Sequence, residues 1–191
     1  FSHDGHRLYV HGVRPDGFGS LDIWYLEVTD SGWGPPVNIG SPPNTERLES
    51  QPGFTVEQEM YFTGHRDSVG MNRGIYLCRR TEDGWEEPML VGGNVNTPSI
   101  EYTPFISQDG GTLLFSSSRP GTEEANLRLY VSFMAKTGEW SEPMNLSEAL
   151  DWEKPARFPA LSPDGQFLFF LSDGDIYWAS ASVIDRLRPV Q

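Results

Sequence analysis

The stretch "SPDGQFLFFLSDGDIYW", residues 162–178, decides the fold. It contains an Asp-Gly turn, an apolar run, a second Asp-Gly turn and another apolar segment, the pattern of a β-hairpin. Related stretches start at Phe1 ("FSHDGHRLYVHGVR"), Phe54 ("FTVEQEMYFTGHR") and Ile106 ("ISQDGGTLLFSSSR"). The Ser or Thr that opens each turn lies at Ser2, Thr55, Ser107 and Ser162, in steps of 53, 52 and 55 residues. The chain is therefore a tandem repeat.

Further landmarks keep the same period. The tryptophans Trp33, Trp85 and Trp140 each follow an apolar segment and are 52 and 55 residues apart. The repeats span approximately residues 1–51, 52–103, 104–158 and 159–191. The second repeat carries "TVEQ" in place of Ser-x-Asp-Gly, which predicts the strand there but not the tight turn.

Each repeat predicts four short strands, with a proline suited to an outer edge strand at positions 35, 88 and 143. Four-stranded units of this length are typical of the blades of a β-propeller, which stack around an axis because one sheet cannot bury both faces. A β-sandwich is the alternative, but it does not explain the period. The segment "SVIDRLRP" is the single candidate helix. The predicted fold is all-β, a propeller of four-stranded antiparallel blades.

The stretches "SPDGQFLFFLSDGDIYW" and "GEWSEPMNLSEALDWEKPARFPALSPDG" resemble the WD-repeat-like, Pro-Asp-Gly propeller repeat of TolB and its relatives. The resemblance covers essentially the whole chain. It implies a propeller fold and a periplasmic or other extracytoplasmic location in a bacterium. It implies no particular ligand.

The predicted ring does not close in the sequence. The strands add up to 3 + 4 + 4 + 3 = 14, two short of four full blades. The 191 residues form a single propeller domain or the carboxyl-terminal part of a larger propeller, six-bladed by resemblance. A small four-bladed ring and a partial ring completed by a second chain remain alternatives. An exposed blade face would be a large apolar patch, which favours a homo-oligomer through open blade faces.

Charge and composition limit the classes of molecule that the protein is expected to bind. The 27 acidic and 14 basic residues give a net charge of −13, which disfavours nucleic acid and anionic membranes. No apolar run approaches the length of about 18 residues needed to cross a bilayer. The one cysteine, Cys78, rules out an intrachain disulfide. A protein or a carbohydrate is the expected partner, and the sequence predicts no cofactor.

The residues just before each first strand are the first candidates for a site, because first strands line the axis of a propeller. Alignment on Pro52, Pro104 and Pro159 places Glu49, Glu101 and Ala156 at one level, with Tyr102 and Arg157 at the next. Two axial carboxylates can bind a cation or act as acid and base. The alternative is a repeat-encoded hydrogen bond between neighbouring blades. Arg157 breaks the repeat and suits an anionic ligand.

The ends of the second strands give a second set of candidates. Arg14, Arg66 and Arg119 share one repeat position, Asp173 replaces them in the last repeat, and His11 and His65 lie nearby. The two histidines lack matched spacing, so no metal site is predicted. Trp152, in "LDWEKPARF", breaks the repeat and is a candidate for stacking on a ligand. His65 and Arg66 complete the candidate ligand-binding residues.

The sequence favours a non-enzymatic binding or interaction domain of the bacterial cell envelope. A glycan-active enzyme, either a lyase or a glycosidase with an axial carboxylate site, is the alternative. A purely structural domain within a larger chain is a third hypothesis. The sequence shows no Gly-x-Ser-x-Gly elbow, no phosphate loop and no zinc spacing.

Overall fold

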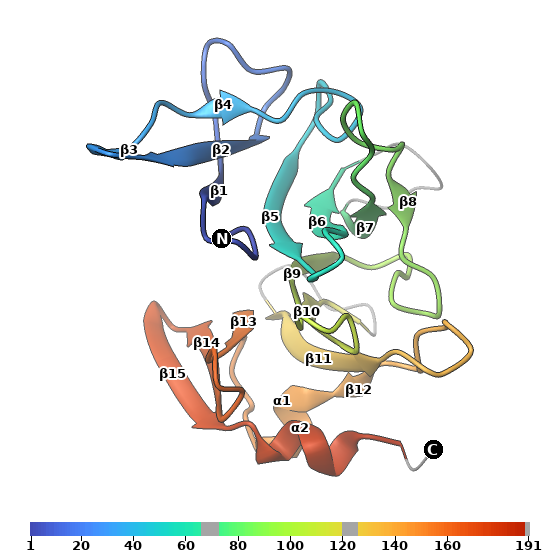
Figure 1. The fold of residues 1–191 in the computed structure, drawn as a ribbon. Helices are drawn as coiled ribbons and strands as arrows, with labels where there is room; N and C mark the ends of the chain where they lie inside the picture. Colours follow the sequence, from blue (N-terminus) through green and yellow to red (C-terminus); the bar gives the residue numbers. More distant parts are fainter. Residues whose placement is uncertain (66–72, 120–125, 190–191) are drawn as a thin grey trace.

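The chain forms four small antiparallel sheets arranged as a four-blade β-propeller (Figure 1). This computed structural model describes residues 1–65, 73–119 and 126–189. The predicted all-β propeller is confirmed. None of the helices in these ranges has the length and apolar character needed to cross a bilayer.

The sheets follow one another along the chain. Sheet 1 contains β1 (Arg7–Gly12), β2 (Asp22–Thr29), β3 (Gly32–Trp33) and β4 (Val37–Asn38). Sheet 2 contains β5 (Glu49–Phe54), β6 (Met60–Gly64), β7 (Gly74–Cys78) and β8 (Met89–Leu90). Sheet 3 contains β9 (Glu101–Ile106), β10 (Thr112–Ser117), β11 (Arg128–Phe133) and β12 (Met144–Asn145). Sheet 4 contains β13 (Arg157–Leu161), β14 (Phe167–Ser172) and β15 (Asp175–Ser180).

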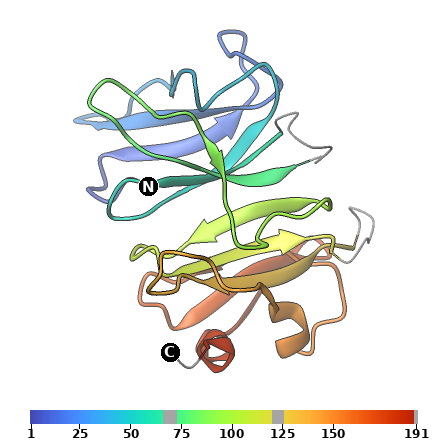
Figure 2. The same ribbon diagram turned by 90° about the vertical axis from the view of Figure 1, so that its right-hand side faces the viewer.

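In the described ranges, two short helices accompany the sheets. The helix α1 (Leu146–Ala149) lies between sheets 3 and 4, and α2 (Ser182–Leu187) follows sheet 4, where the sequence predicts a helix. The innermost strands β1, β5, β9 and β13 lie nearest the centre of Figure 1, and the four sheets stack in the turned view of Figure 2. Sheet 1 begins with β1, which follows the turn as β6, β10 and β14 do in the other sheets. It has four strands rather than the predicted three because the short β3 pairs with the end of β2, so the described sheets contain 15 strands where the sequence predicts 14.

The hairpin that opened the sequence analysis forms with the expected register. Phe167 pairs with Ser180, and the ladder ends at the pair of Ser172 and Asp175. Asp173 and Gly174 make the two-residue turn with φ of 51° and 85°. Both residues have the left-handed backbone that a type I′ turn requires.

The tight turns before the second strands also form, both at a Ser-x-Asp-Gly sequence and at "TVEQ" in the second repeat, where the sequence predicts no tight turn. In the third repeat the Ser107 hydroxyl donates to Asp109 at 2.5 Å, and Asp109 accepts from the Gly111 amide at 2.9 Å. In the second repeat the Gln58 amide donates to the Thr55 carbonyl at 3.0 Å, and Gln58 adopts a φ of 60°. The prediction that "TVEQ" lacks a tight turn is therefore wrong, because Gln58 takes the left-handed position.

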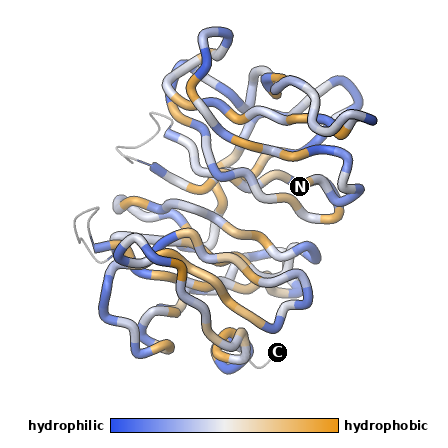
Figure 3. The backbone as a smooth tube through the Cα atoms, turned by 90° about the vertical axis from the view of Figure 1, so that its left-hand side faces the viewer, coloured by the Kyte–Doolittle hydropathy of each residue, from blue (hydrophilic) through white to orange (hydrophobic). Residues whose placement is uncertain are grey.

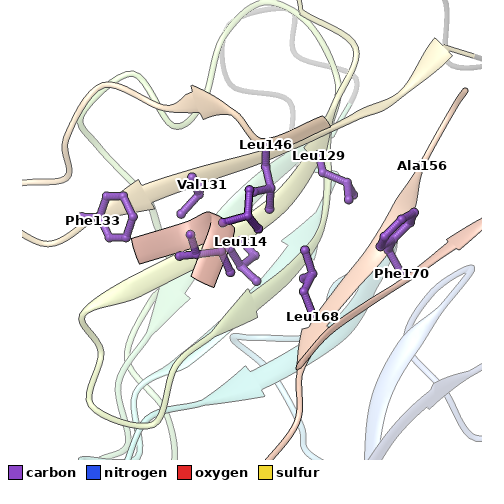
Figure 4. Close-up of a cluster of buried hydrophobic side chains, with 10 residues drawn as sticks. Leu114, Leu129, Val131, Phe133, Leu146, Ala156, Leu168 and Phe170 are labelled. Carbon is purple, nitrogen blue, oxygen red and sulfur yellow. The ribbon is translucent and has the colours of Figure 1, made fainter. Parts of the chain in front are cut away.

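Alternate residues of each strand pack against the neighbouring sheets. Between sheets 3 and 4, Leu114, Leu129 and Val131 meet Leu168 and Phe170 (Figure 4). Equivalent clusters join sheet 2 to sheet 3 around Phe115 and Tyr61, and sheet 1 to sheet 2 around Phe62 and Ile23. This burial supplies most of the stability of stacked sheets.

One face of sheet 4 stays open. Phe169 pairs with Trp178 and Leu171 pairs with Ile176, so their side chains share that face. Ile176 is 76% exposed and Trp178 is 66% exposed. Figure 3 shows hydrophobic stretches along the strands and hydrophilic ones at many turns. The open face of sheet 4 therefore carries apolar side chains, as the buried faces of the other sheets do.

Candidate functional site

The axial surface is built from a strained position that recurs in three sheets. Gln51, Thr103 and Phe158 have φ of 49°, 52° and 54°, each beside an irregularity in the pairing of the first and second strands. A left-handed backbone costs a non-glycine residue about 1 kcal/mol or more. A proline follows each of the three residues, and the three tripeptides line a hollow of about 260 Å³.

Side chains from neighbouring strands hold the amides of these three residues. The Thr103 amide donates to Thr63 Oγ1 at 3.1 Å, and the Phe158 amide donates to Thr103 Oγ1 at 3.2 Å. The Gln51 amide donates to His11 Nδ1 at 3.4 Å. The bulge is therefore fixed from one sheet to the next. Sequence reasoning missed Gln51 and Phe158, whose one signal is the repeated proline that follows them.

Glu49 is fully buried and is bound within the loop that enters sheet 2. Its carboxylate accepts from the Thr45 amide at 2.8 Å and from Thr45 Oγ1 at 2.6 Å. Its own amide donates to the carbonyl of Leu21, the residue before β2, at 2.7 Å. Its carboxylate thus holds the loop from inside.

Glu101 repeats this arrangement and adds an ion pair. Its carboxylate accepts from the Thr97 amide at 3.1 Å, from Thr97 Oγ1 at 2.8 Å and from Ser117 Oγ at 3.0 Å. The Arg119 guanidinium lies 3.1 Å away. Both predicted axial glutamates are therefore engaged in repeat-encoded hydrogen bonds, mostly with their own connecting loop rather than with a neighbouring blade.

The third connecting loop lacks this network. Asp151, Trp152 and Ala156 stand at the positions of Asn96, Thr97 and Glu101. Ala156 is buried, and a hollow of about 250 Å³ opens between it, Arg157 and the turn after β14. The loss of the glutamate leaves space at the axial end of sheet 4.

Arg157 lies beside that hollow. Its side chain is exposed, and its guanidinium carbon lies 5.8 Å from the centre of the Phe158 ring. Among the residues that the structure describes, no carboxylate forms an ion pair with it. The nearby Asp173 pairs instead with Lys154 at 2.7 Å. Arg157 is thus an available cation at the axial end.

Tyr102 lies between the axial residues of two sheets. Gln51 Nε2 donates to the Tyr102 hydroxyl at 3.3 Å and lies 3.3 Å from His11 Nε2. The Tyr102 ring lies 6.1 Å from the Phe158 ring, and the Arg73 guanidinium lies 5.3 Å above it. Desolvation lowers the pKa of His11 below its usual range, which favours the neutral imidazole.

Trp152 packs inside the molecule, against sheet 4. Its ring centre lies 5.1 Å from that of Phe170 and 4.6 Å from that of Tyr177. Its indole Nε1 is buried and has no hydrogen-bond partner in the described ranges. These contacts give Trp152 a packing role, and its use as a stacking platform stays a prediction.

The remaining candidates are the residues near the ends of the second strands. His65 is partly buried, and its amide donates to the Leu48 carbonyl at 2.9 Å. Arg66 lies outside the described residues. Arg14 pairs with Asp16 at 3.4 Å and lies over Trp24. Within the described ranges, no three His, Cys, Asp or Glu side chains gather in a way that would hold a metal ion.

Comparison with known proteins supports the fold. No protein-family model and no curated protein sequence matches the chain. The solved structure of TolB from Acinetobacter baumannii is similar over 92% of this chain and 39% of that chain, at 17% identity and a TM-score of 0.54. The α-L-arabinofuranosidase from Lactobacillus brevis is similar over 89% of this chain and 60% of that chain, at 16% identity and a TM-score of 0.55.

The shared feature is the propeller fold. One of these two proteins is named as an enzyme and the other is not, and identities this low carry the fold alone. The chain spans less than two thirds of either structure.

Proposed function

We propose that the protein is a non-enzymatic propeller domain that binds an acidic group of a ligand or protein partner at the axial end, around Arg157. One contrast carries the proposal: Glu101 is buried and engaged by Thr97, Ser117 and Arg119, whereas Arg157 is exposed, has no ion-pair partner among the described residues and lies next to a hollow of about 250 Å³. By its resemblance to the TolB-like repeat, the domain works in the bacterial cell envelope.

The chemistry around Arg157 suits a carboxylate. A guanidinium offers two parallel donors to a carboxylate, and a hydrogen bond to a charged group contributes about 1.5–3 kcal/mol. The Phe158 ring lies next to the guanidinium, and the Tyr102 ring lies 6.1 Å from the Phe158 ring, so an apolar surface adjoins the cation. The net charge of −13 gives no long-range attraction for acidic ligands, so the local guanidinium would have to supply the recognition.

The glycosidase alternative has less support. Glycoside hydrolysis needs two carboxyl groups flanking the scissile bond, one of them free to donate a proton. Glu49 and Glu101 are both fully buried, and each is bound by a threonine four residues earlier. Freeing either carboxylate would break the loop that it holds.

A matched peptide pair tests the proposal. Calorimetric titration would compare a tetrapeptide that ends in a free carboxylate with its carboxyl-terminal amide. We expect the carboxylate to bind roughly tenfold more tightly, the Arg157→Gln variant to lose that preference, and the Arg186→Gln variant on α2 to retain it. Equal binding of both peptides would contradict the proposal. Hydrolysis of 4-nitrophenyl α-L-arabinofuranoside that a folded Glu101→Gln variant loses would establish the enzyme instead.

We also propose that the open face of sheet 4 pairs with another propeller sheet, supplied by a second copy of the chain. The exposure of Phe169, Ile176 and Trp178 on one face supports this. Light scattering should give at least twice the chain mass of 21.5 kDa, and Ile176→Ser with Trp178→Ser should return the monomer mass. A wild-type chain that stays monomeric would refute this pairing.

A further inference from the structure

The three interfaces between sheets use the same positions but are not closed to the same degree. At the interface of sheets 2 and 3, Tyr61 meets Trp140 edge-on at 6.1 Å and is 2% exposed. Burial raises the pKa of Tyr61 to about 12, as expected for a phenol sealed from water. At the interface of sheets 1 and 2, the equivalent residues Tyr9 and Trp85 are only partly buried.

A cleft opens where Tyr9 and Trp85 stay apart. Phe54 stands between them, with ring centres 4.2 Å from Tyr9 and 6.3 Å from Trp85. A hollow of about 300 Å³ is lined by these three rings together with Arg7 and Arg80. A second hollow of about 200 Å³ shares Tyr9, Trp85 and both arginines. Together they lie at the lower end of the size range of small-molecule sites.

The walls of this cleft are well defined. Ser2 Oγ accepts from the Arg7 amide at 2.8 Å, and the Ser2 amide donates to the Arg7 carbonyl at 2.8 Å. The Arg7 guanidinium pairs with Glu27 at 2.8 Å and lies 4.4 Å from the Tyr25 ring. Arg7 is therefore committed to its own sheet and forms a fixed wall.

Arg80 differs from Arg7 in its partners. Its guanidinium lies 5.1 Å from the centre of the Trp85 ring, and within the described part of the chain it pairs with no carboxylate. The preceding arginine, Arg79, is paired with Glu59 at 2.9 Å. Arg80 is therefore an uncommitted cation beside an aromatic surface, and both hollows reach it. Carboxylates also line the hollows: Glu27 is paired with Arg7, Asp4 accepts from Ser2 Oγ at 2.6 Å, and Asp83 lines the smaller hollow.

We propose that the cleft between sheets 1 and 2 binds a small ring-bearing ligand with one acidic group, such as an aromatic carboxylate or an acidic sugar. The ring would pack on Phe54 and Trp85, which aromatic and sugar rings both suit. The acidic group would accept hydrogen bonds from Arg80. This site is separate from Arg157 and does not rest on the axial proposal, because the two sets of lining residues do not overlap.

Nuclear magnetic resonance titration with four probes tests the cleft. Benzoate and D-glucuronate carry the acid, and benzyl alcohol and methyl glucoside are the neutral counterparts. The readout is the indole signal of Trp85, assigned through a Trp85→Phe variant. We expect saturable shifts with at least one acid at concentrations up to about 10 mM, the affinity range of a ligand with some ten heavy atoms.

Two adjacent arginines provide the matched control. Arg80→Gln should weaken binding of the acid at least tenfold and leave a neutral ring unchanged, whereas Arg79→Gln should leave both unchanged. The preferred acid identifies the source: benzoate indicates an aromatic ligand and glucuronate an acidic sugar. The absence of a saturable shift at Trp85, or equal loss in both arginine variants, would overturn the proposal. Equal unfolding midpoints of the two variants would show that the comparison is made between folded proteins.

Discussion

Two connecting loops each join the last strand of one sheet to the first strand of the next, but different side chains hold them. The loop from β8 to β9 carries Asn96, Thr97 and Glu101, and the loop from β12 to β13 carries Asp151, Trp152 and Ala156 at the same repeat positions. In the first loop Asn96 accepts from the Ile75 amide at 2.7 Å and donates to the carbonyls of Ile75 and Val91 at 2.9 and 2.8 Å. That loop is a satisfied polar network.

The second loop is held by an apolar side chain. Ser147 Oγ accepts from the Leu129 amide at 2.9 Å, which replaces one of the three hydrogen bonds of Asn96. Trp152 packs against Phe170 and Tyr177 in place of the buried carboxylate network. The first loop uses its polar groups internally, whereas the second has Ala156 in place of the buried glutamate and a hollow beside it. The proposed binding of an acidic group at Arg157 rests on this difference.

The largest expected effect is the loss of Glu101. The Glu101→Ala variant removes the acceptor of three hydrogen bonds and leaves the largely buried Arg119 without its carboxylate. We expect the free energy of unfolding to fall by about 3–5 kcal/mol, measured by urea denaturation. The exposed Glu153, in the other loop, provides the control: Glu153→Ala should change stability by less than about 0.5 kcal/mol. A loss below about 1 kcal/mol for Glu101→Ala would mean that the network does not hold the loop.

Trp152 should be the second most costly position. Trp152→Thr restores the residue type of the other two loops but removes the ring packed on Phe170 and Tyr177. We expect a loss of about 2–3 kcal/mol, below the value for a fully buried tryptophan because Trp152 is only partly buried. Trp178→Thr, on the open face, should cost less than about 1 kcal/mol at concentrations where the chain is monomeric. Equal costs at the two tryptophans would remove the distinction between a packed loop and an open face.

Features that depend on neighbouring residues in the sequence could be predicted, and features that depend on contacts between distant strands could not. Hairpins and the repeat period were predictable because Asp-Gly turns and alternating apolar residues act within a few positions. A structural use of Glu49 and Glu101 was predicted as an alternative, but as a bond between neighbouring blades, whereas each carboxylate binds the threonine four residues earlier in its own connecting loop. The left-handed backbone of Gln51 and Phe158 was not predicted, because a bulge and side chains from neighbouring strands impose it. The cleft beside Arg80 depends on the spacing of two sheets, which no residue type encodes.

A milder test compares the first polar residue of each loop. Asn96→Ala removes the hydrogen-bond partner of the Ile75 amide, of the Ile75 carbonyl and of the Val91 carbonyl. We expect the free energy of unfolding to fall by about 2–3 kcal/mol. Ser147→Ala removes the acceptor of one amide and should cost about 1 kcal/mol. Amide hydrogen exchange should show faster exchange at Ile75 in the first variant and at Leu129 in the second. Unchanged protection at Ile75 would mean that another group satisfies its amide.

The smallest expected effect is at the tight turns before the second strands. The third repeat has an aspartate, Asp109, in this turn, and the second repeat does not. Hydrogen bonds from the Ser107 hydroxyl and the Gly111 amide hold the pKa of Asp109 below its usual value. Because the folded-state pKa is lowered, this carboxylate stabilises the fold above the unfolded pKa of about 4, and the contribution is lost as the pH falls through the lower folded pKa. Asp109→Asn should therefore cost at most about 1 kcal/mol near neutral pH, since the carboxylate is exposed and screened.

The pH dependence of stability shows whether Asp109 stabilises the turn through its charge. The stability difference between wild type and Asp109→Asn should shrink as the pH is lowered from about 6 towards the folded-state pKa of Asp109, below which both states bind the proton. Glu57, at the matching position of the second turn, is exposed and forms no hydrogen bond through its carboxylate in the described ranges, so Glu57→Gln should show no such trend. A constant difference for Asp109→Asn across this range would mean that the side chain stabilises the turn without its charge. The aspartate of the repeat would then stabilise the turn through a hydrogen-bond geometry that asparagine does not reproduce, and the two turns would differ in shape rather than in electrostatics.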